Sequence, residues 1–477
     1  MRNIRIATLF VMITLFTGPA YSLENKLSGF YNVRGISDNF SATNNYIGTF
    51  ADDSKSESLV DQRLRLKLDS QINDFLSFVY YAEVDMQWGD ESYSNSGRND
   101  GGAIGGDTTN LETKNVYFDA NYPESNHSFR VGLQGFDDNY DYSFFGADMA
   151  GVKYSGKIND LDLVAGWFLL IESDFDKTDD VNLWALQTNY EFSKNLKIGG
   201  DYYYYQNQGS RDYATFFGTT DIDAVIGEGA WTANREEMDL HYLGGHGEYR
   251  LDNLVLSGWL NVNVGSVDEI NNDLSSPTSA ENLDVRGYAA RLNLDTKING
   301  VNLRLGGTYF SGDDDLTDGD ANFIVNPLAT ESFAFATDGF MIFTPDIAWN
   351  SVGQYGFALV DAAWAGYGLG SVVLTARYTP ESAKDLSIKG GVGYFTSLED
   401  KLAANDPRTD RAGTEMGTEV FLRVGYTVSE KLNLSLNGAY AHLGDFYDDH
   451  GGGTAVNDLV TSIDDPYEVY LKATLTF

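Results

Sequence analysis

Apolar and polar residues alternate with a period of two along most of the chain. In residues 63–68 leucine alternates with arginine or lysine, and one apolar face runs through each of 161–171, 254–264 and 420–428. Successive side chains of a β-strand point to opposite faces, so this period is typical of strands that are apolar on one face and polar on the other. The pattern predicts an all-β protein.

Short turns rich in Asn, Asp and Gly separate many of the predicted strands. These residues tolerate the positive φ angles of tight hairpins. Eight such turns lie at 72–75, 123–126, 158–161, 193–196, 251–254, 298–301, 383–386 and 429–432. Nine longer polar segments alternate with them, at 37–57, 89–110, 137–145, 173–180, 209–236, 267–282, 313–368, 399–413 and 446–464. Seventeen alternating connections predict about eighteen strands.

Strands with one apolar face, joined by short turns at one end and long loops at the other, are the layout of an outer-membrane barrel. Only helices and closed barrels satisfy their backbone hydrogen bonds in lipid, and after the N-terminal segment no apolar run reaches the length of a transmembrane helix. We therefore predict one transmembrane up-and-down antiparallel β-barrel over residues 23–477, with short periplasmic turns and long extracellular loops. A soluble β-sandwich or β-helix would not keep this alternation of short and long connections.

The first residues have the features of a secretory signal peptide. Arg2 and Arg5 precede the apolar run 7–16, and Ala20-Tyr21-Ser22 fits a small-x-small cleavage site. We expect cleavage after Ser22, so that residues 1–22 leave the mature chain. At the other end, the alternating residues that lead to Phe477 resemble the terminal signal of barrels delivered to the bacterial barrel assembly machinery.

Composition narrows the function classes. The chain has no cysteine, which excludes disulfides, thiolate metal sites and a covalently attached c-type haem. Without Arg2 and Arg5 the chain holds 30 basic and 70 acidic residues, a net charge of −40 that argues against nucleic-acid binding. The 30 Tyr and 28 Phe argue against a disordered acidic protein. Several aromatic residues lie near strand ends on apolar faces, where interfacial girdles are expected: Trp88, Tyr154, Tyr202, Tyr309, Tyr394, Tyr426 and Tyr440.

The polar face of each strand would line the lumen. The predicted pore-lining residues are Arg63, Arg65, Lys67, Glu83, Asp85, Asp119, Arg130, Asp201, Arg291, Asp295, Arg304, Arg377, Arg423 and Lys472. One interpretation is a wall that guides anionic or hydroxylated solutes past an acidic outer mouth, as charged rings do in other pores. The other is that bases and acids pair across neighbouring strands and hold the wall rigid. The two interpretations are compatible.

The connection 313–368 is about 55 residues long and rich in apolar side chains. A loop this long is usually functional, and its apolar residues would be costly in water. We predict that it folds into the lumen and forms a constriction with Phe333, Phe335, Phe340, Phe343 and Trp349. The alternative is an outward mini-domain packed on its own aromatic residues.

Metal and enzyme signals are weak. The run Asp313–Asp320 has some resemblance to a calcium loop, but Ile324 stands where such a loop needs Glu. We expect no cofactor beyond weakly bound Ca²⁺ at the acidic loops. Of the five histidines, His241 and His246 are five residues apart on one strand and so point to opposite faces, and no matching Ser motif accompanies them. We predict no catalytic residues, no metal site and no enzyme activity.

The mature chain resembles a Gram-negative porin. Residues 62–68, followed by Asn73-Asp74 and a third strand, are similar to the opening of eighteen-strand porins of the alginate-export-like type. That resemblance implies a basic lumen, to which the seven predicted pore-lining arginines would correspond. The alginate substrate is not carried over, because carboxylates are scattered through the lumen and the loops.

These observations favour an outer-membrane porin for passive diffusion of small polar or charged solutes. The alternative is a barrel that forms a sheath around a partner in an electron-transfer or export complex. The partners expected are outer-membrane lipid, lipopolysaccharide, small polar solutes and the barrel assembly machinery, with a homo-oligomer compatible with the sequence.

Overall fold

A computed structural model describes residues 24–39, 56–89, 102–104, 111–122, 124–172, 180–208, 237–268, 282–315, 318–326, 338–344, 366–400, 413–448 and 465–477. The predicted signal peptide, residues 1–22, lies outside these ranges. The strands are β1 (Glu24–Asp38), β2 (Glu57–Gln71), β3 (Leu76–Gln87), β4 (Glu112–Tyr122), β5 (His127–Asp137), β6 (Gly146–Ile158), β7 (Leu161–Ile171), β8 (Val181–Ser193), β9 (Leu196–Gln208), β10 (Glu237–Leu251), β11 (Leu254–Asp268), β12 (Leu283–Ile298), β13 (Val301–Phe310), β14 (Asp320–Ala321), β15 (Leu369–Tyr378), β16 (Leu386–Thr396), β17 (Glu415–Ser429), β18 (Leu432–Leu443) and β19 (Tyr467–Thr476). A short helix, α4 (Asp445–Asp448), follows β18.

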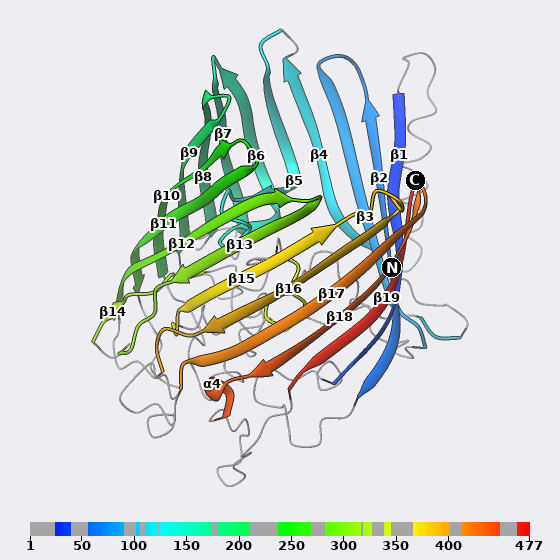
Figure 1. Ribbon diagram of the computed structural model, residues 1–477. Coiled ribbons are helices and arrows are strands. Elements are labelled where there is room, and N and C mark those ends of the chain that lie inside the picture. Colours follow the sequence, from blue (N-terminus) through cyan, green and yellow to red (C-terminus); the bar gives the residue numbers. More distant parts are fainter. Residues whose placement is uncertain are drawn as a thin grey trace.

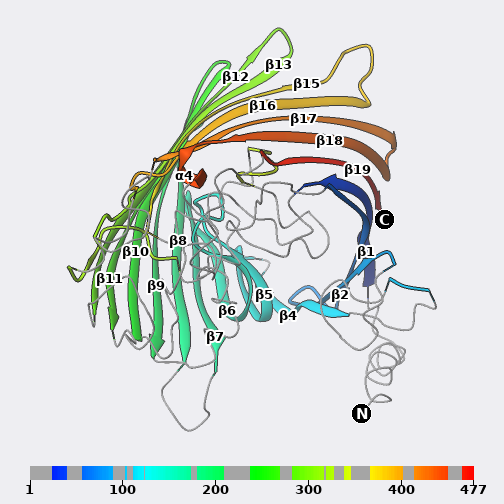
Figure 2. The same ribbon diagram turned by 90° about the horizontal axis from the view of Figure 1, so that it is seen from below.

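Eighteen long strands form one closed antiparallel sheet, as Figures 1 and 2 show. Each strand pairs with its neighbours in the chain, and β1 closes the barrel by pairing with β19 as well as with β2. The closing register joins Phe30 to Thr476 and Asp38 to Glu468. The two-residue β14 is an addition that pairs in parallel with β12. The prediction of an up-and-down barrel of eighteen strands is confirmed.

The short turns contain the residues that their backbone requires. Asn126, Asn159, Asp252 and Asn299 have φ angles between 47° and 56°, in the left-handed region that Asn and Asp tolerate. The turn after β2 is held by the side chain of Asn73, whose carbonyl oxygen accepts the backbone N–H groups of Phe75 and Leu76 at 2.9 Å. Local side-chain chemistry therefore sets the hairpins.

The outer face of the barrel is apolar and exposed. Leu292, Leu422 and Leu471 are 54–59% exposed on this face. Outward tyrosines lie near both ends of the strands: Tyr249, Tyr378 and Tyr426 near the short turns, and Tyr309, Tyr394 and Tyr440 near the long connections. Two aromatic rows that flank an apolar band are the girdles expected at membrane interfaces. In the described part of the chain, no helix is long and apolar enough to cross a bilayer.

Candidate functional site in the barrel lumen

The lumenal face of β1–β3 carries buried ion pairs. Arg34 of β1 pairs with Asp61 of β2 at 2.6 Å, and Arg63 of β2 pairs with Asp85 of β3 at 2.7 Å. Glu83 of β3 forms ion pairs with both Arg63, at 3.3 Å, and Arg65. Because these charges are withdrawn from solvent, their pairing is what makes their burial tolerable.

Two further ion pairs also join neighbouring strands. Arg130 of β5 contacts Asp119 of β4 at 2.7 Å and lies over the ring of Tyr117, 4.0 Å from its centroid. Arg304 of β13 contacts Asp295 of β12 at 2.8 Å. The interpretation that acids and bases pair to hold the wall thus applies to much of the predicted pore lining.

Asp85→Asn will lower the free energy of unfolding of the barrel by about 1–3 kcal/mol, because it weakens two buried charge-assisted hydrogen bonds from Arg63. Urea unfolding in detergent micelles, followed by tryptophan fluorescence, measures this change. Asp295→Asn is the matched control, since the Asp295–Arg304 pair is about one-third exposed and should contribute no more than about 1 kcal/mol. Equal decreases in the free energy of unfolding of the two variants would show that burial does not determine how much these ion pairs stabilise the barrel.

The connection between β5 and β6 folds into the lumen. The carboxylate of Asp138 accepts the backbone N–H groups of Tyr140, Tyr142, Phe144 and Phe145 at 2.7–3.0 Å. Burial raises the pKa of Asp138 to about 7, while the N–H donors oppose that rise. One acidic side chain therefore shapes the whole segment 138–145.

Aromatic rings fix this segment against the wall. Tyr140 lies 5.6 Å from Trp259 of β11, centroid to centroid, and Phe145 lies 5.1 Å from both Tyr203 of β9 and Tyr242 of β10. All these rings are buried, and aromatic pairs at such distances contribute beyond their buried area. The sequence placed 137–145 among the long polar connections, and the structure shows instead that its aromatic residues fill one side of the lumen.

A second inward segment belongs to the long connection between β13 and β15. Glu419 of β17 accepts the backbone N–H groups of Met341, Ile342 and Phe343 at 2.7–3.3 Å. The Phe343 ring stacks on Phe395 of β16 at 4.3 Å. The Phe340 ring packs edge-on against Phe395 and Phe421. Of the predicted constriction residues, Phe340 and Phe343 thus lie against the lumenal wall, whereas Phe333, Phe335 and Trp349 lie outside the described residues.

Arg291 of β12 joins the two inward segments. Its guanidinium bonds Asp338 of the second segment and lies 3.4 Å from Asp141 of the first. Trp259 donates its indole N–H to the same Asp141 carboxylate at 2.9 Å. Arg291 is almost fully buried, so the two segments are tied together through one charged side chain.

A row of bases remains on the adjacent wall. Arg377 of β15 is directly opposite Lys389 of β16, which is directly opposite Arg423 of β17. Arg423 donates to the carbonyl of Phe340 at 3.4 Å, and Lys389 lies 5.9 Å from the centroid of the Phe421 ring. Among described residues none of the three forms an ion pair, and like charges opposite one another repel. This row therefore presents positive charge to the lumen that no described ion pair neutralises.

All fourteen predicted pore-lining residues fall on the inward positions of their strands. Lys67 lies opposite Tyr81, Lys472 lies opposite Arg34, and Asp201 accepts the amide of Asn139 at 3.1 and 3.2 Å. That prediction omitted Arg34, Asp61 and Glu419. The same alternation that selected the other residues also assigns these three to the lumenal face.

His241 and His246 lie on opposite faces of β10. His241 stacks on the outward ring of Tyr204, whereas His246 lies 3.5 Å from lumenal Asp201. Within the described ranges, no group of three His, Cys, Asp or Glu side chains is arranged to hold a metal ion. The acidic run 313–320 is described only in part, so weak Ca²⁺ binding there stays a prediction.

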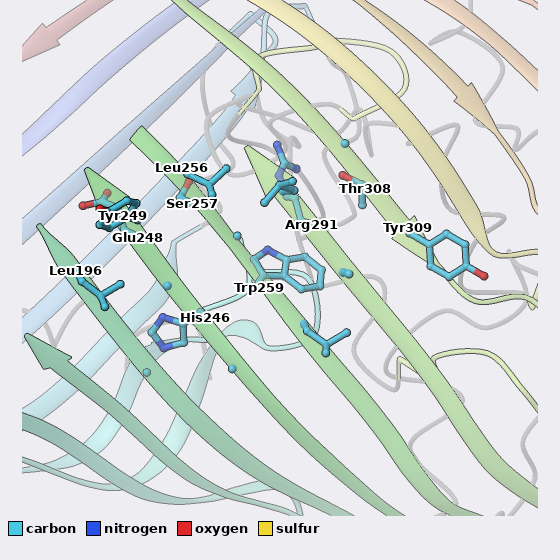
Figure 3. Close-up of a pocket in the computed structure, with 18 of the residues that line it drawn as sticks. Leu196, His246, Glu248, Tyr249, Leu256, Ser257, Trp259, Arg291, Thr308 and Tyr309 are labelled. Atoms are coloured by element: carbon cyan, nitrogen blue, oxygen red, sulfur yellow. The ribbon is translucent and has the colours of Figure 1, made fainter. Parts of the chain in front are cut away.

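A shallow hollow of about 910 Å³ lies over β9–β13. Its rim is formed by Leu256, Leu292 and Tyr309, which are 39–58% exposed on the outer face. Figure 3 shows this stretch of the wall, on which His246 and Arg291 are inward-facing positions. We assign the hollow to the outer surface of the barrel and not to the lumen.

No known family model matches the chain, and no curated protein matches its sequence. Solved structures match it over almost the whole length. OccAB1 of Acinetobacter baumannii is 13% identical with a TM-score of 0.55, covering 95% of this chain and 96% of that chain. OccK8 (OprE) of Pseudomonas aeruginosa is 13% identical with a TM-score of 0.51, covering 95% and 98%.

The outer membrane protein OpdK from Pseudomonas aeruginosa is 11% identical with a TM-score of 0.51, covering 95% of this chain and 98% of that chain. A further structure of OpdK contains vanillate, with 12% identity and a TM-score of 0.52 over 95% of this chain and 98% of that one. At this level of identity the likeness establishes a shared fold, that of the eighteen-strand outer-membrane barrels.

Proposed function

We propose that the protein is a bacterial outer-membrane porin through which small polar or charged solutes diffuse passively. The observation that carries the proposal is a closed eighteen-strand barrel that is apolar outside and charged inside. Water-filled channels in such barrels have this distribution of residues. The fold shared with OccAB1, OccK8 and OpdK supports the same function.

The row of Arg377, Lys389 and Arg423 favours anions. These three neighbouring bases attract a carboxylate or phosphate solute that enters the lumen. None of them forms an ion pair with a described residue. Vanillate, found with OpdK, is a small aromatic carboxylate, and a solute of this class would suit the row. We propose that the basic wall is a feature this barrel shares with alginate-export-like porins. The polysaccharide substrate of those porins is not part of the proposal.

The inward segments argue against a sheath around a partner protein. A sheath needs a wide lumen, but residues 138–145 and 338–344 pack inside the barrel and are tied to each other by Arg291. Two anchored segments that narrow the lumen suit a pore that selects small solutes.

The outer face defines the other partners that we propose. The apolar band and its two rows of tyrosines would contact membrane lipid, and the end with the long connections would meet lipopolysaccharide. We also propose that the barrel assembly machinery inserts the chain, since the outward residues Val469, Leu471 and Leu475 of β19 continue the apolar band to the closing strand. A homo-oligomer would place two such bands in contact.

Liposome swelling tests the proposal. Proteoliposomes that hold a trapped impermeant sugar polymer are diluted into solutions of small solutes, and light scattering reports solute entry. Small carboxylates and sugars should enter at rates that fall with solute size, and liposomes with heat-unfolded protein should not swell. A folded barrel that admits no solute at all would contradict a porin.

A further inference from the structure

A second cavity lies inside the barrel, on the side of segment 138–145 that faces the short turns. It has a volume of about 330 Å³ and is lined by side chains of β8–β12 and by Asn139 and Asp141 of that segment. This volume is at the lower end of the range of about 300–1,000 Å³ found for small-molecule sites. Figure 3 labels four of its lining residues, His246, Glu248, Ser257 and Trp259, on β10 and β11.

Asn139 and Asp141 of segment 138–145 form one side of this cavity, which we call its roof, and hydrogen bonds hold it in place. Asn139 donates its amide N–H groups to both carboxylate oxygens of Asp201, which also accepts the backbone N–H of Thr188 at 3.1 Å. Two glycines leave room for the roof and the wall. A Cβ on Gly244 would lie 2.4 Å from the Tyr140 hydroxyl, and one on Gly199 would lie 2.3 Å from Nε2 of His246. The two glycines thus make room for the side chains of Tyr140 and His246 beside this cavity.

The charges that line the cavity balance. Lys197 and Arg250 contribute two positive charges, and Glu248 and Asp141 contribute two negative charges. Arg250 contacts Glu248 at 2.6 Å, and Asp141 is held by Trp259 and Arg291. The remaining polar side chains, Asn189 and Ser257 among them, are neutral donors and acceptors. The cavity therefore differs in character from the row of Arg377, Lys389 and Arg423 on the other wall.

We infer that this cavity, called the station below, is a binding site for a neutral polyhydroxylated solute of monosaccharide size. Amide, hydroxyl and paired charged groups can donate to and accept from sugar hydroxyls without favouring a net charge. The inference rests on the proposed porin function and adds a solute class that the basic row does not select. Its lining residues on β8–β11 place it at the end of the lumen that is near the short turns.

Current interruption by D-glucose tests the station. Single channels in a planar bilayer are exposed to glucose on either side, and the rate and duration of brief current blocks give a binding constant. The double variant Asn189→Leu/Ser257→Val should weaken that constant by about tenfold or more, the loss expected from two hydrogen bonds. Asn302→Leu, an exposed lumenal asparagine of β13 outside the cavity, is the matched control and should behave as the wild type.

Each outcome decides the question. Blocks that the double variant weakens and the control retains support the station. A conducting channel that glucose does not block, or blocks equally in all three proteins, overturns the inference and leaves the porin function standing. Blocks by glycine betaine but not by glucose would overturn the sugar class in favour of a zwitterion. If no channel conducts, the porin proposal fails, and saturation-transfer NMR of glucose with the detergent-solubilised barrel then tests the cavity by itself.

Discussion

Glu419→Gln will raise the single-channel conductance and make it fluctuate. The carboxylate of Glu419 holds three consecutive backbone N–H groups of segment 338–344 against the wall. Glutamine keeps one acceptor oxygen and turns an amide N–H₂ group toward the remaining donors, which removes about 2–4 kcal/mol of anchoring from a buried site. A segment freed by this amount leaves the wall for part of the time and the path for ions widens. Planar-bilayer recording measures both effects.

The matched control is Glu191→Gln. Glu191 is an exposed glutamate on an inward position of β8, and it forms no hydrogen bond or ion pair with the described residues of either inward segment. Its variant should keep the wild-type conductance and the wild-type noise. If Glu419→Gln gave the same steady steps as this control, segment 338–344 would not be held by Glu419, or it would not limit the current.

The double variant Lys389→Gln/Arg423→Gln will move the ion selectivity toward cations. A unit charge about 8 Å from a permeating ion changes its energy by about 0.5–2 kcal/mol, depending on the local dielectric. Since 1.4 kcal/mol corresponds to a factor of ten, two such charges should lower the chloride-to-potassium permeability ratio by about tenfold. The reversal potential under a potassium chloride gradient measures this ratio directly.

Arg286→Gln is the control for that experiment. Arg286 is an exposed arginine on an outward position of β12, so it changes the net charge without changing the lumen. Its reversal potential should match that of the wild type. The double variant removes two charges and the control removes one. A control shift about half that of the double variant would therefore mean that the charge of the whole protein, and not the row in the lumen, determines selectivity.

The sequence predicts the barrel because its determinants are local. Alternation with a period of two assigns each residue to the outer or the lumenal face, and Asn and Asp in the short turns mark the hairpins. The turns also fix register, so Arg63 and Asp85 lie equally far from Asp74 in the turn after β2, as Arg304 and Asp295 do from the turn at 299–300. The sequence therefore contains enough information to predict these ion pairs, although cross-strand pairing was predicted only in general and not for these partners.

The contacts that anchor the inward segments could not be predicted from the sequence. Glu419 binds residues 78 positions earlier in the chain, and Arg291 contacts Asp338 across 47 positions, with no hairpin register to relate them. Segment 138–145 does carry a local signal, the aromatic residues Tyr140, Phe144 and Phe145 in a connection that is otherwise mostly polar. Apolar content identified the long connection 313–368 as unusual, but which of its residues contact the wall depends on packing that no local pattern encodes.

Conductance of the purified barrel in a planar bilayer tests most directly whether it is an open pore. The structure predicts discrete current steps and a reversal potential on the anion side, set by Arg377, Lys389 and Arg423. A barrel that is folded, as judged by its heat-modifiable migration in gels, but produces no steps would contradict an open pore. It would instead indicate a lumen that the inward segments seal until a partner binds.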